Sequence, residues 1–147
     1  MGKLKELQKR SNDLVKNWAK IRSDALNETK EIALDVITDD QLFKKGIDGD
    51  GNKLPLPYAP FTISIKKALG QPTDRITLKD TGAFYDGFFA NISGDNMTIG
   101  SSDSKSSKLH KVWGKSISSM TKANTERYAR EDVLPILQDS IRKALGL

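Results

Sequence analysis

The segment from Lys3 to Asp40 contains no glycine or proline, and it constrains the fold more than any other feature of this chain. Apolar and small side chains recur in it at spacings of three and four residues over three heptads, namely Leu4, Leu7, Ser11, Leu14, Trp18, Ile21 and Ala25. This period is that of an amphipathic helix with one apolar seam. We therefore predict one long helix over residues 3–38.

Such a helix is too long for a single small domain to cover. About 35 residues of α-helix extend about 50 Å, which exceeds the width of a compact domain of this size. The helix must then bend, or part of its seam must pack on another subunit. The candidate residues for an interface between subunits are Leu4, Leu7, Leu14, Trp18 and Ile21.

Residues 39–60 are predicted to form a loop, because glycines and prolines are concentrated in their second half. Within this loop, the alternating Asp48, Asp50 and Asn52 are reminiscent of a calcium-binding loop. The sixth position of such a loop should be glycine and the twelfth glutamate, but they are Lys53 and Ala59 here. The segment therefore predicts a tight turn and no cation site.

Residues 61–114 are predicted to form an α+β core. The segment Thr62–Gly70 fits either a strand or a short helix, and its good helix formers favour the helix. The aromatic run Phe84–Ile92 and the segment Met97–Gly100 read as two strands joined by a four-residue turn, which predicts a β-hairpin over residues 87–100. A short helix is expected over Lys108–Trp113, ending at Gly114.

The last predicted element is a helix over residues 121–146 that is kinked at Pro135, because proline removes one backbone hydrogen bond. We therefore predict a single domain over residues 1–147 of the α+β class, with a long N-terminal helix, a small antiparallel sheet with a hairpin, and a kinked C-terminal helix. Two strands alone are marginally stable, so a third strand or a helical cover is required.

The composition excludes several classes of function. The chain has no cysteine, which excludes disulfides, cysteine-ligated metals and thiol catalysis. Its one histidine, His110, lies among lysines and is more typical of a surface than of a catalytic base. Neighbouring carboxylates, Asp39 with Asp40 and Glu131 with Asp132, diverge on a helix and make poor catalytic pairs. We predict no enzymatic activity, no cofactor and no metal.

Apolar runs in the chain are too short to cross a bilayer, so we expect an intracellular protein without membrane contact. The net charge of +5 is unevenly spread, with basic residues in excess over residues 1–30 and 101–115 and acidic residues in excess between them. This pattern fits solvated helix faces, contact with a polyanion, or contact with an oppositely charged copy of the same chain. One functional alternative is therefore a small DNA-binding accessory protein that uses Lys3, Lys5, Lys9, Arg10, Lys16 and Lys20.

A series of short motifs follows a fixed order from Leu42 to Gly114. Its distinctive residues are Phe43, Tyr58, Thr62, Thr81, Gly82, Phe84, Gly100, Trp113 and Gly114. This order resembles that of the tailed-phage virion morphogenesis proteins of the phage Mu G type and the related tail-completion and neck proteins. The chain departs from them at Ser116–Thr121, where that family often has a proline-rich segment before the last helix.

The resemblance implies a structural virion protein of the head–tail joint, a tail-completion or neck component that assembles as a homo-oligomeric ring without catalysis. Its implied partners are copies of itself and the portal, connector or tail proteins of the virion. The implied location is the virion, with host cytoplasm during assembly. In such a ring Lys105, Lys108, Lys111 and Lys115 would face the lumen and make non-specific contact with packaged DNA.

Overall fold

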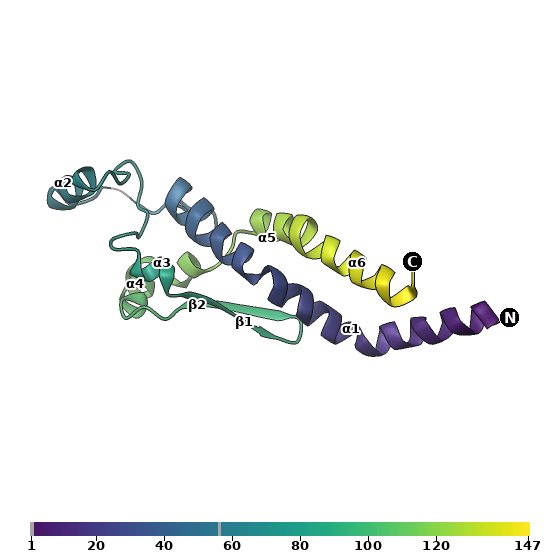
Figure 1. Cartoon of the computed structure of the whole chain (residues 1–147). Coiled ribbons are helices and arrows are strands. Elements are labelled where there is room, and N and C mark those ends of the chain that lie inside the picture. The colour runs from purple at the N-terminus through teal and green to yellow at the C-terminus, as the bar shows by residue number, and fades with distance from the viewer. Residues whose placement is uncertain (1, 56) are drawn as a thin grey trace.

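The computed structural model describes residues 2–55 and 57–147. Its N-terminal helix α1 (Gly2–Asp35) continues without a break into the π-helical segment η1 (Val36–Lys45). The helix stops at Gly46, whose φ of 60° lies in the left-handed region. The long N-terminal helix is confirmed, and Figure 1 shows that it bends towards its N-terminal end. The predicted helix end at residue 38 and the predicted start of the loop at residue 39 are wrong, because Gln41 and Leu42 are buried and hold the last turns against the core.

Three short helices and a 3₁₀ turn occupy the middle of the chain: α2 (Pro60–Ala68), α3 (Ala83–Asp86), α4 (Ser106–Trp113) and η2 (Lys115–Ser118). Helix α2 confirms the preference for a helix over a strand after Pro60, which stands in its first turn. Helix α4 ends at Gly114 as predicted. Helix α3 was not predicted, and it replaces the first residues of the expected strand.

The C-terminal helix consists of α5 (Lys122–Tyr128), the π-helical turn η3 (Ala129–Val133) and α6 (Leu134–Leu145), which follow one another directly. The Thr121 hydroxyl caps its start by accepting a hydrogen bond from the backbone N–H of Asn124 at 3.1 Å. Pro135 lies in the first turn of α6, immediately after the wide turn of η3. The predicted bend at Pro135 is therefore present as a slight one, because the π turn accommodates the missing N–H.

The sheet is an antiparallel hairpin of β1 (Phe88–Ser93) and β2 (Asn96–Ser101). Its pairing ends at Ser93 and Asn96, so the loop has the two residues Gly94 and Asp95 and not the four predicted. Gly94 has a φ of 62°, as the first loop position of a type II′ turn requires. In the described residues this sheet has two strands, and its cover is helical.

Helix α1 packs against the hairpin and against α6 (Figure 1). Two contacts place α6 antiparallel to α1. The hydroxyls of Thr29 and Tyr128 lie 2.6 Å apart near the start of the C-terminal helix, and Arg10 Nη1 donates to the Leu145 carbonyl at 3.1 Å near its end. The turns of α1 that precede Arg10 therefore extend past the end of α6.

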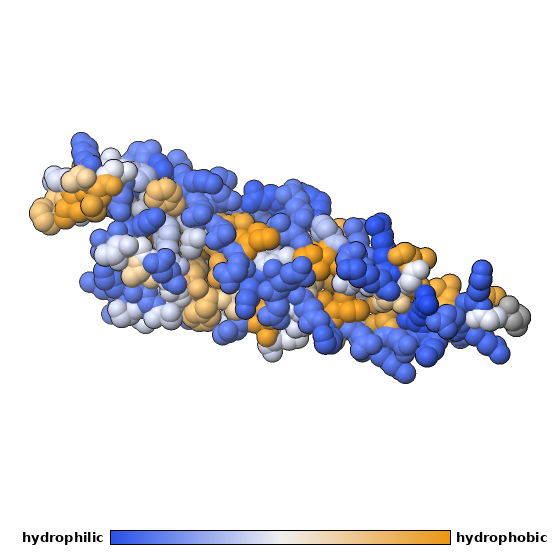
Figure 2. All heavy atoms as spheres, in the orientation of Figure 1, coloured by the Kyte–Doolittle hydropathy of each residue, from blue (hydrophilic) through white to orange (hydrophobic). Residues whose placement is uncertain are grey.

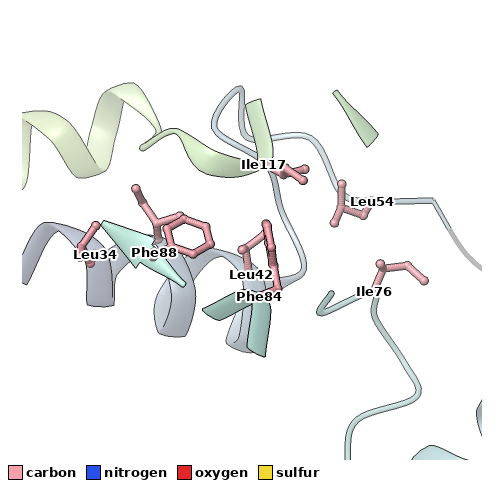
Figure 3. Close-up of a cluster of buried hydrophobic side chains, with 8 residues drawn as sticks. Leu34, Leu42, Leu54, Ile76, Phe84, Phe88 and Ile117 are labelled. Atoms are coloured by element: carbon pink, nitrogen blue, oxygen red, sulfur yellow. The ribbon is translucent and has the colours of Figure 1, made fainter. Parts of the chain in front are cut away.

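One apolar core joins the second half of the N-terminal helix to the hairpin and the loops (Figure 3). Its buried members are Leu34, Ile37, Leu42, Leu54, Ile76, Phe84, Phe88 and Ile117. The Phe84 and Phe88 rings meet edge to face with centroids 5.1 Å apart, which explains why the aromatic run folds back as α3 before β1 begins.

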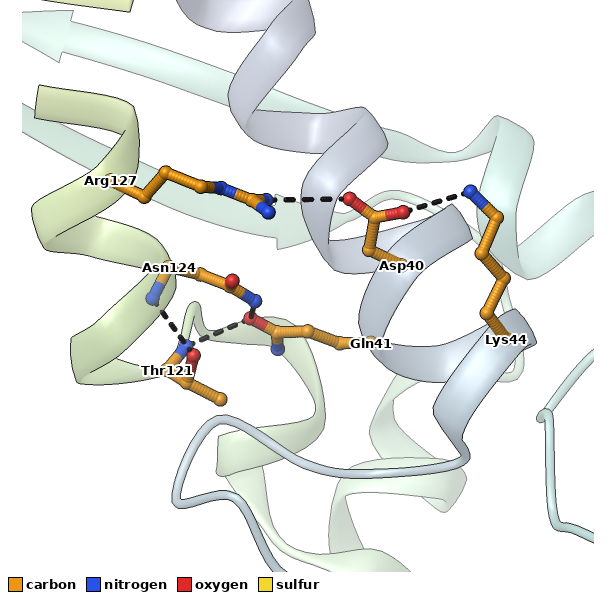
Figure 4. Close-up of polar contacts among 6 residues, drawn as sticks. All are labelled: Asp40, Gln41, Lys44, Thr121, Asn124 and Arg127. Carbon is orange, nitrogen blue, oxygen red and sulfur yellow. Dashed lines mark hydrogen bonds and ion pairs between the residues drawn. The ribbon is translucent and has the colours of Figure 1, made fainter. Parts of the chain in front are cut away.

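A polar cluster ties η1 to the C-terminal helix (Figure 4). The buried Gln41 Oε1 accepts hydrogen bonds from the backbone N–H of Thr121 at 2.8 Å and from Asn124 Nδ2 at 2.9 Å. Gln41 Nε2 donates to the Ser119 carbonyl at 3.0 Å. Beside it, the Asp40 carboxylate pairs with Lys44 at 2.9 Å and with Arg127 at 3.4 Å.

The Asp40 pairs make a prediction about pH. The hydrogen bond from Lys44, with a further contribution from Arg127, lowers the pKa of Asp40 below its ordinary value of 3.8. A lowered folded-state pKa stabilises the fold above the ordinary value, and this contribution disappears as pH falls through the lower, folded-state value. Asp40→Asn is thus expected to cost less than about 1 kcal/mol at neutral pH. Urea unfolding should show the cost vanishing in strong acid, and a cost that is unchanged at about pH 2 would contradict the ion-pair explanation.

The predicted turn at Asp48 is confirmed. Its Oδ1 accepts hydrogen bonds from the backbone N–H groups of Asp50 and Asn52, both at 2.9 Å. Its Oδ2 accepts one from the Ser116 hydroxyl at 3.1 Å. The carboxylate that suggested calcium therefore holds the loop closed and attaches it to η2.

Candidate functional site: an apolar groove between α2 and α4

A groove of about 540 Å³ lies between α2, the segment from Ile76 to Phe84, and α4. We call it the α2–α4 groove. Its walls are mostly apolar, and its polar groups lie at the rim, where Lys105 pairs with Asp80 at 3.2 Å. A groove of this size and character is suited to apolar side chains presented by another segment.

One wall is an exposed apolar face of α2. Phe61, Ile65 and Leu69 follow at intervals of four residues, so they lie on one side of this helical segment. They are 77 %, 42 % and 61 % exposed. Figure 2 shows hydrophobic residues concentrated at the tip of the molecule that α2 forms. Sequence reasoning missed this face, although its spacing was visible in the sequence.

Polar contacts hold α2 in place while its apolar face stays open. The buried Lys66 Nζ donates to the Lys79 carbonyl at 2.9 Å and to Gln71 Oε1 at 3.2 Å. The same ammonium lies 5.0 Å from the centroid of the Tyr58 ring, a cation–π distance. The Tyr58 hydroxyl accepts a hydrogen bond from the Thr77 N–H at 3.0 Å.

The segment between Ile76 and Phe84 is strained where it lines the groove. Leu78 has a φ of 57°, a left-handed conformation that costs a non-glycine residue about 1 kcal/mol or more. Close by, the Tyr85 hydroxyl donates to the Thr77 carbonyl. Burial, with a smaller effect from Asp39, raises the pKa of Tyr85 well above its usual range, so this hydroxyl remains a donor at every physiological pH.

Six of the nine residues that carry the family resemblance line this one groove: Tyr58, Thr62, Thr81, Gly82, Phe84 and Trp113. Three do not. Phe43 lies beneath Lys79, whose Nζ is 5.0 Å from its ring centroid. Gly100 lies in β2 against the Phe89 ring, which a Cβ would meet at 2.9 Å, and Gly114 ends α4 with a φ of 90°. Residues far apart in the sequence thus form a common surface.

The predicted basic residues lie at the same end of the chain. Lys105 lines the groove, and Lys108 and Lys111 are exposed on α4. Lys115 is exposed at the start of η2.

The predicted helix seam is not one open surface. Leu4 and Leu7 are 67 % and 46 % exposed on the turns that extend past α6. Leu14, Trp18 and Ile21 are half-buried along the stretch of α1 that α6 accompanies. The Arg22 guanidinium also lies 5.8 Å from the Trp18 ring centroid. Part of the seam therefore finds its cover inside the chain.

The described residues hold no group of three or more His, Cys, Asp and Glu side chains that could bind a metal ion. The half-buried His110 has its Nε2 2.6 Å from the Ser118 hydroxyl, which fixes α4 to η2. In residues 2–55 and 57–147, every helix is too short or too polar to cross a membrane.

No family model, curated protein or solved structure matches this chain. The resemblance to phage virion morphogenesis proteins therefore rests on the residues named above and on their convergence at the groove.

Proposed function

We propose that this chain is a structural protein of a phage virion, a tail-completion or neck component of the head–tail joint that assembles with copies of itself into a ring and performs no catalysis. The observation that supports this most is apolar surface left open at both ends of the chain. One such surface is the α2 face of the α2–α4 groove, and the other comprises Leu4 and Leu7.

Exposed apolar patches on small proteins are typical of interaction sites. The two patches here differ in sequence and structure and lie at opposite ends of α1 (Figure 1). Two different surfaces support a head-to-tail contact between copies, which forms a closed ring when the rotation between neighbours closes. We expect neighbouring copies to cover both patches in the ring.

The resemblance supplies the location and the further partners. Six of its residues share one surface, which supports a common role for them. Lys105, Lys108, Lys111 and Lys115 lie near that surface and would meet packaged DNA if this end faces the lumen. Portal, connector or tail proteins of the virion are the proposed partners on either side of the ring.

Electron microscopy and sedimentation of the purified protein test this proposal. The wild-type chain is expected to form rings, whereas Leu4→Ser combined with Leu7→Ser should shift it towards monomers, because both side chains lie in the open patch. The matched control is Gln8→Ser, an exposed position on the same turns, which should leave the rings intact. A wild-type chain that stays monomeric at high concentration, or rings that survive the double substitution unchanged, would argue against the proposal.

A further inference from the structure

We infer that the basic half of α1 in one copy packs against the acidic half of the same helix in a neighbouring copy, through a head-to-tail contact. This inference rests on the proposed self-assembly and names the surfaces that carry it. It follows from three observations: the segregation of charge along the helix, the lack of partners for these charges within the chain, and their directions around the helix axis.

Charge is divided between the two halves of the N-terminal helix. Residues 2–22 contain seven basic and two acidic residues. Residues 23–40 contain one basic and six acidic residues. Two helices that overlap by such halves gain attraction between opposite charges, whereas overlap of like halves is repulsive.

Several of these charges have no ionic partner within the described part of the chain. Lys5, Lys9 and Lys16 are exposed and make no ion pair there. The same holds for the exposed carboxylates Glu28, Glu31 and Asp35. Other charges on this helix are paired, as in Glu6 with Arg10 at 3.0 Å and Lys20 with Asp24 at 2.6 Å. We call the three lysines the basic face and the three carboxylates the acidic face.

The two faces point in different directions. With 3.6 residues per turn, the three lysines lie within about 40° of one another around the helix axis, and the three carboxylates within about 60°. The mean directions of the two faces differ by about 90°. A two-fold contact between two α1 helices uses the same side of both, so it would not bring both faces together at once.

A head-to-tail contact has no such restriction, because it uses the basic face of one copy and the acidic face of the next. Each copy then keeps one face of each sign for its other neighbour. Such contacts continue from copy to copy until the ring closes. Ile32, which is partly exposed one turn after Glu28, adds apolar area to the acidic face.

Charge reversal tests the inference. The first variant carries Lys5→Glu, Lys9→Glu and Lys16→Glu, and the second carries Glu28→Lys, Glu31→Lys and Asp35→Lys. In sedimentation at about 50 mM salt, where screening is weak, each variant alone should associate at least about tenfold more weakly than the wild type. An equimolar mixture should associate again, because every contact between unlike variants regains opposite charges.

Two controls accompany these variants. Lys53→Glu, Lys67→Glu and Lys122→Glu change the net charge as the first variant does, but at exposed positions away from α1, and should associate like the wild type. A chain with all six reversals exchanges the two faces and keeps the wild-type net charge. It should assemble like the wild type, which also shows that the substituted helix still folds.

The outcomes separate the inference from the proposed function. Wild-type rings together with reversal variants that assemble normally would overturn the inference and leave the ring standing. A mixture that associates while the wild type forms no closed ring would support the inference and contradict the ring. If the lysine reversals weaken only the retention of the protein on duplex DNA, with association unchanged, the basic face binds nucleic acid and the inference fails.

Discussion

A chain carrying Gln41→Leu is expected to lose about 3 kcal/mol of its free energy of unfolding, the larger of the two stability losses considered below. Leucine keeps most of the volume of the buried glutamine, so the loss comes from the hydrogen bonds. The Thr121 N–H, the Asn124 amide and the Ser119 carbonyl all lose their partner. A buried polar group left without a partner costs about 1–3 kcal/mol.

Urea and thermal unfolding measure this loss, which corresponds to a decrease in Tm of roughly 10 °C for a chain of this size. Gln41→Glu keeps the acceptor oxygen but loses the donor to Ser119, so it should fall between the wild type and the leucine variant at a pH where the new side chain is protonated. The control Gln8→Leu, at an exposed position, should change the stability by less than about 0.5 kcal/mol. A Gln41→Leu chain as stable as that control would show that the polar cluster contributes little.

Leu42→Ala should cost nearly as much, about 2–3 kcal/mol, through a different mechanism. The Leu42 side chain is fully buried in the core that joins η1 to the hairpin and the loops. Its truncation removes apolar burial and leaves a cavity that close-packed neighbours cannot fill. The fixed position of Phe84 and Phe88 beside each other limits how far the site can collapse.

Leu4→Ala is the matched substitution at an exposed position of the same helix. It should leave the free energy of unfolding of the monomer nearly unchanged, since little area is buried there. Chemical denaturation of both variants under conditions that keep the chain monomeric makes the comparison. Equal losses at the two positions would mean that Leu42 does not lie in a close-packed core.

The long N-terminal helix was predictable because its apolar period is regular and no glycine or proline interrupts it. Its end was not. Asp39 and Asp40 were interpreted as the start of a loop, yet Lys44 and Arg127 pair with Asp40, and the next two residues enter the core. Such contacts involve residues more than 80 positions apart, and a local pattern cannot reveal them.

The hairpin was predicted in the right place, but Phe84 and Tyr85 were assigned to a strand because aromatic residues favour strands. Packing of Phe84 on Phe88 instead turns this segment into α3. The groove could not be predicted as a site, because its walls come from three segments whose arrangement depends on contacts such as that of the buried Lys66 with the Lys79 carbonyl. Only the α2 face, with its four-residue spacing, had a signal in the sequence.

The two π-helical segments have a consequence for the tolerance of this chain to insertions and deletions. A π turn accommodates an extra residue within a helix, so removing one residue from η1 would favour ordinary α-helical winding. Everything after the deletion would then rotate by about 100° relative to what precedes it. Gln41 would turn away from Asn124, and Leu42 would leave the core. The length of this segment, and not only its residue types, is therefore part of what specifies the fold.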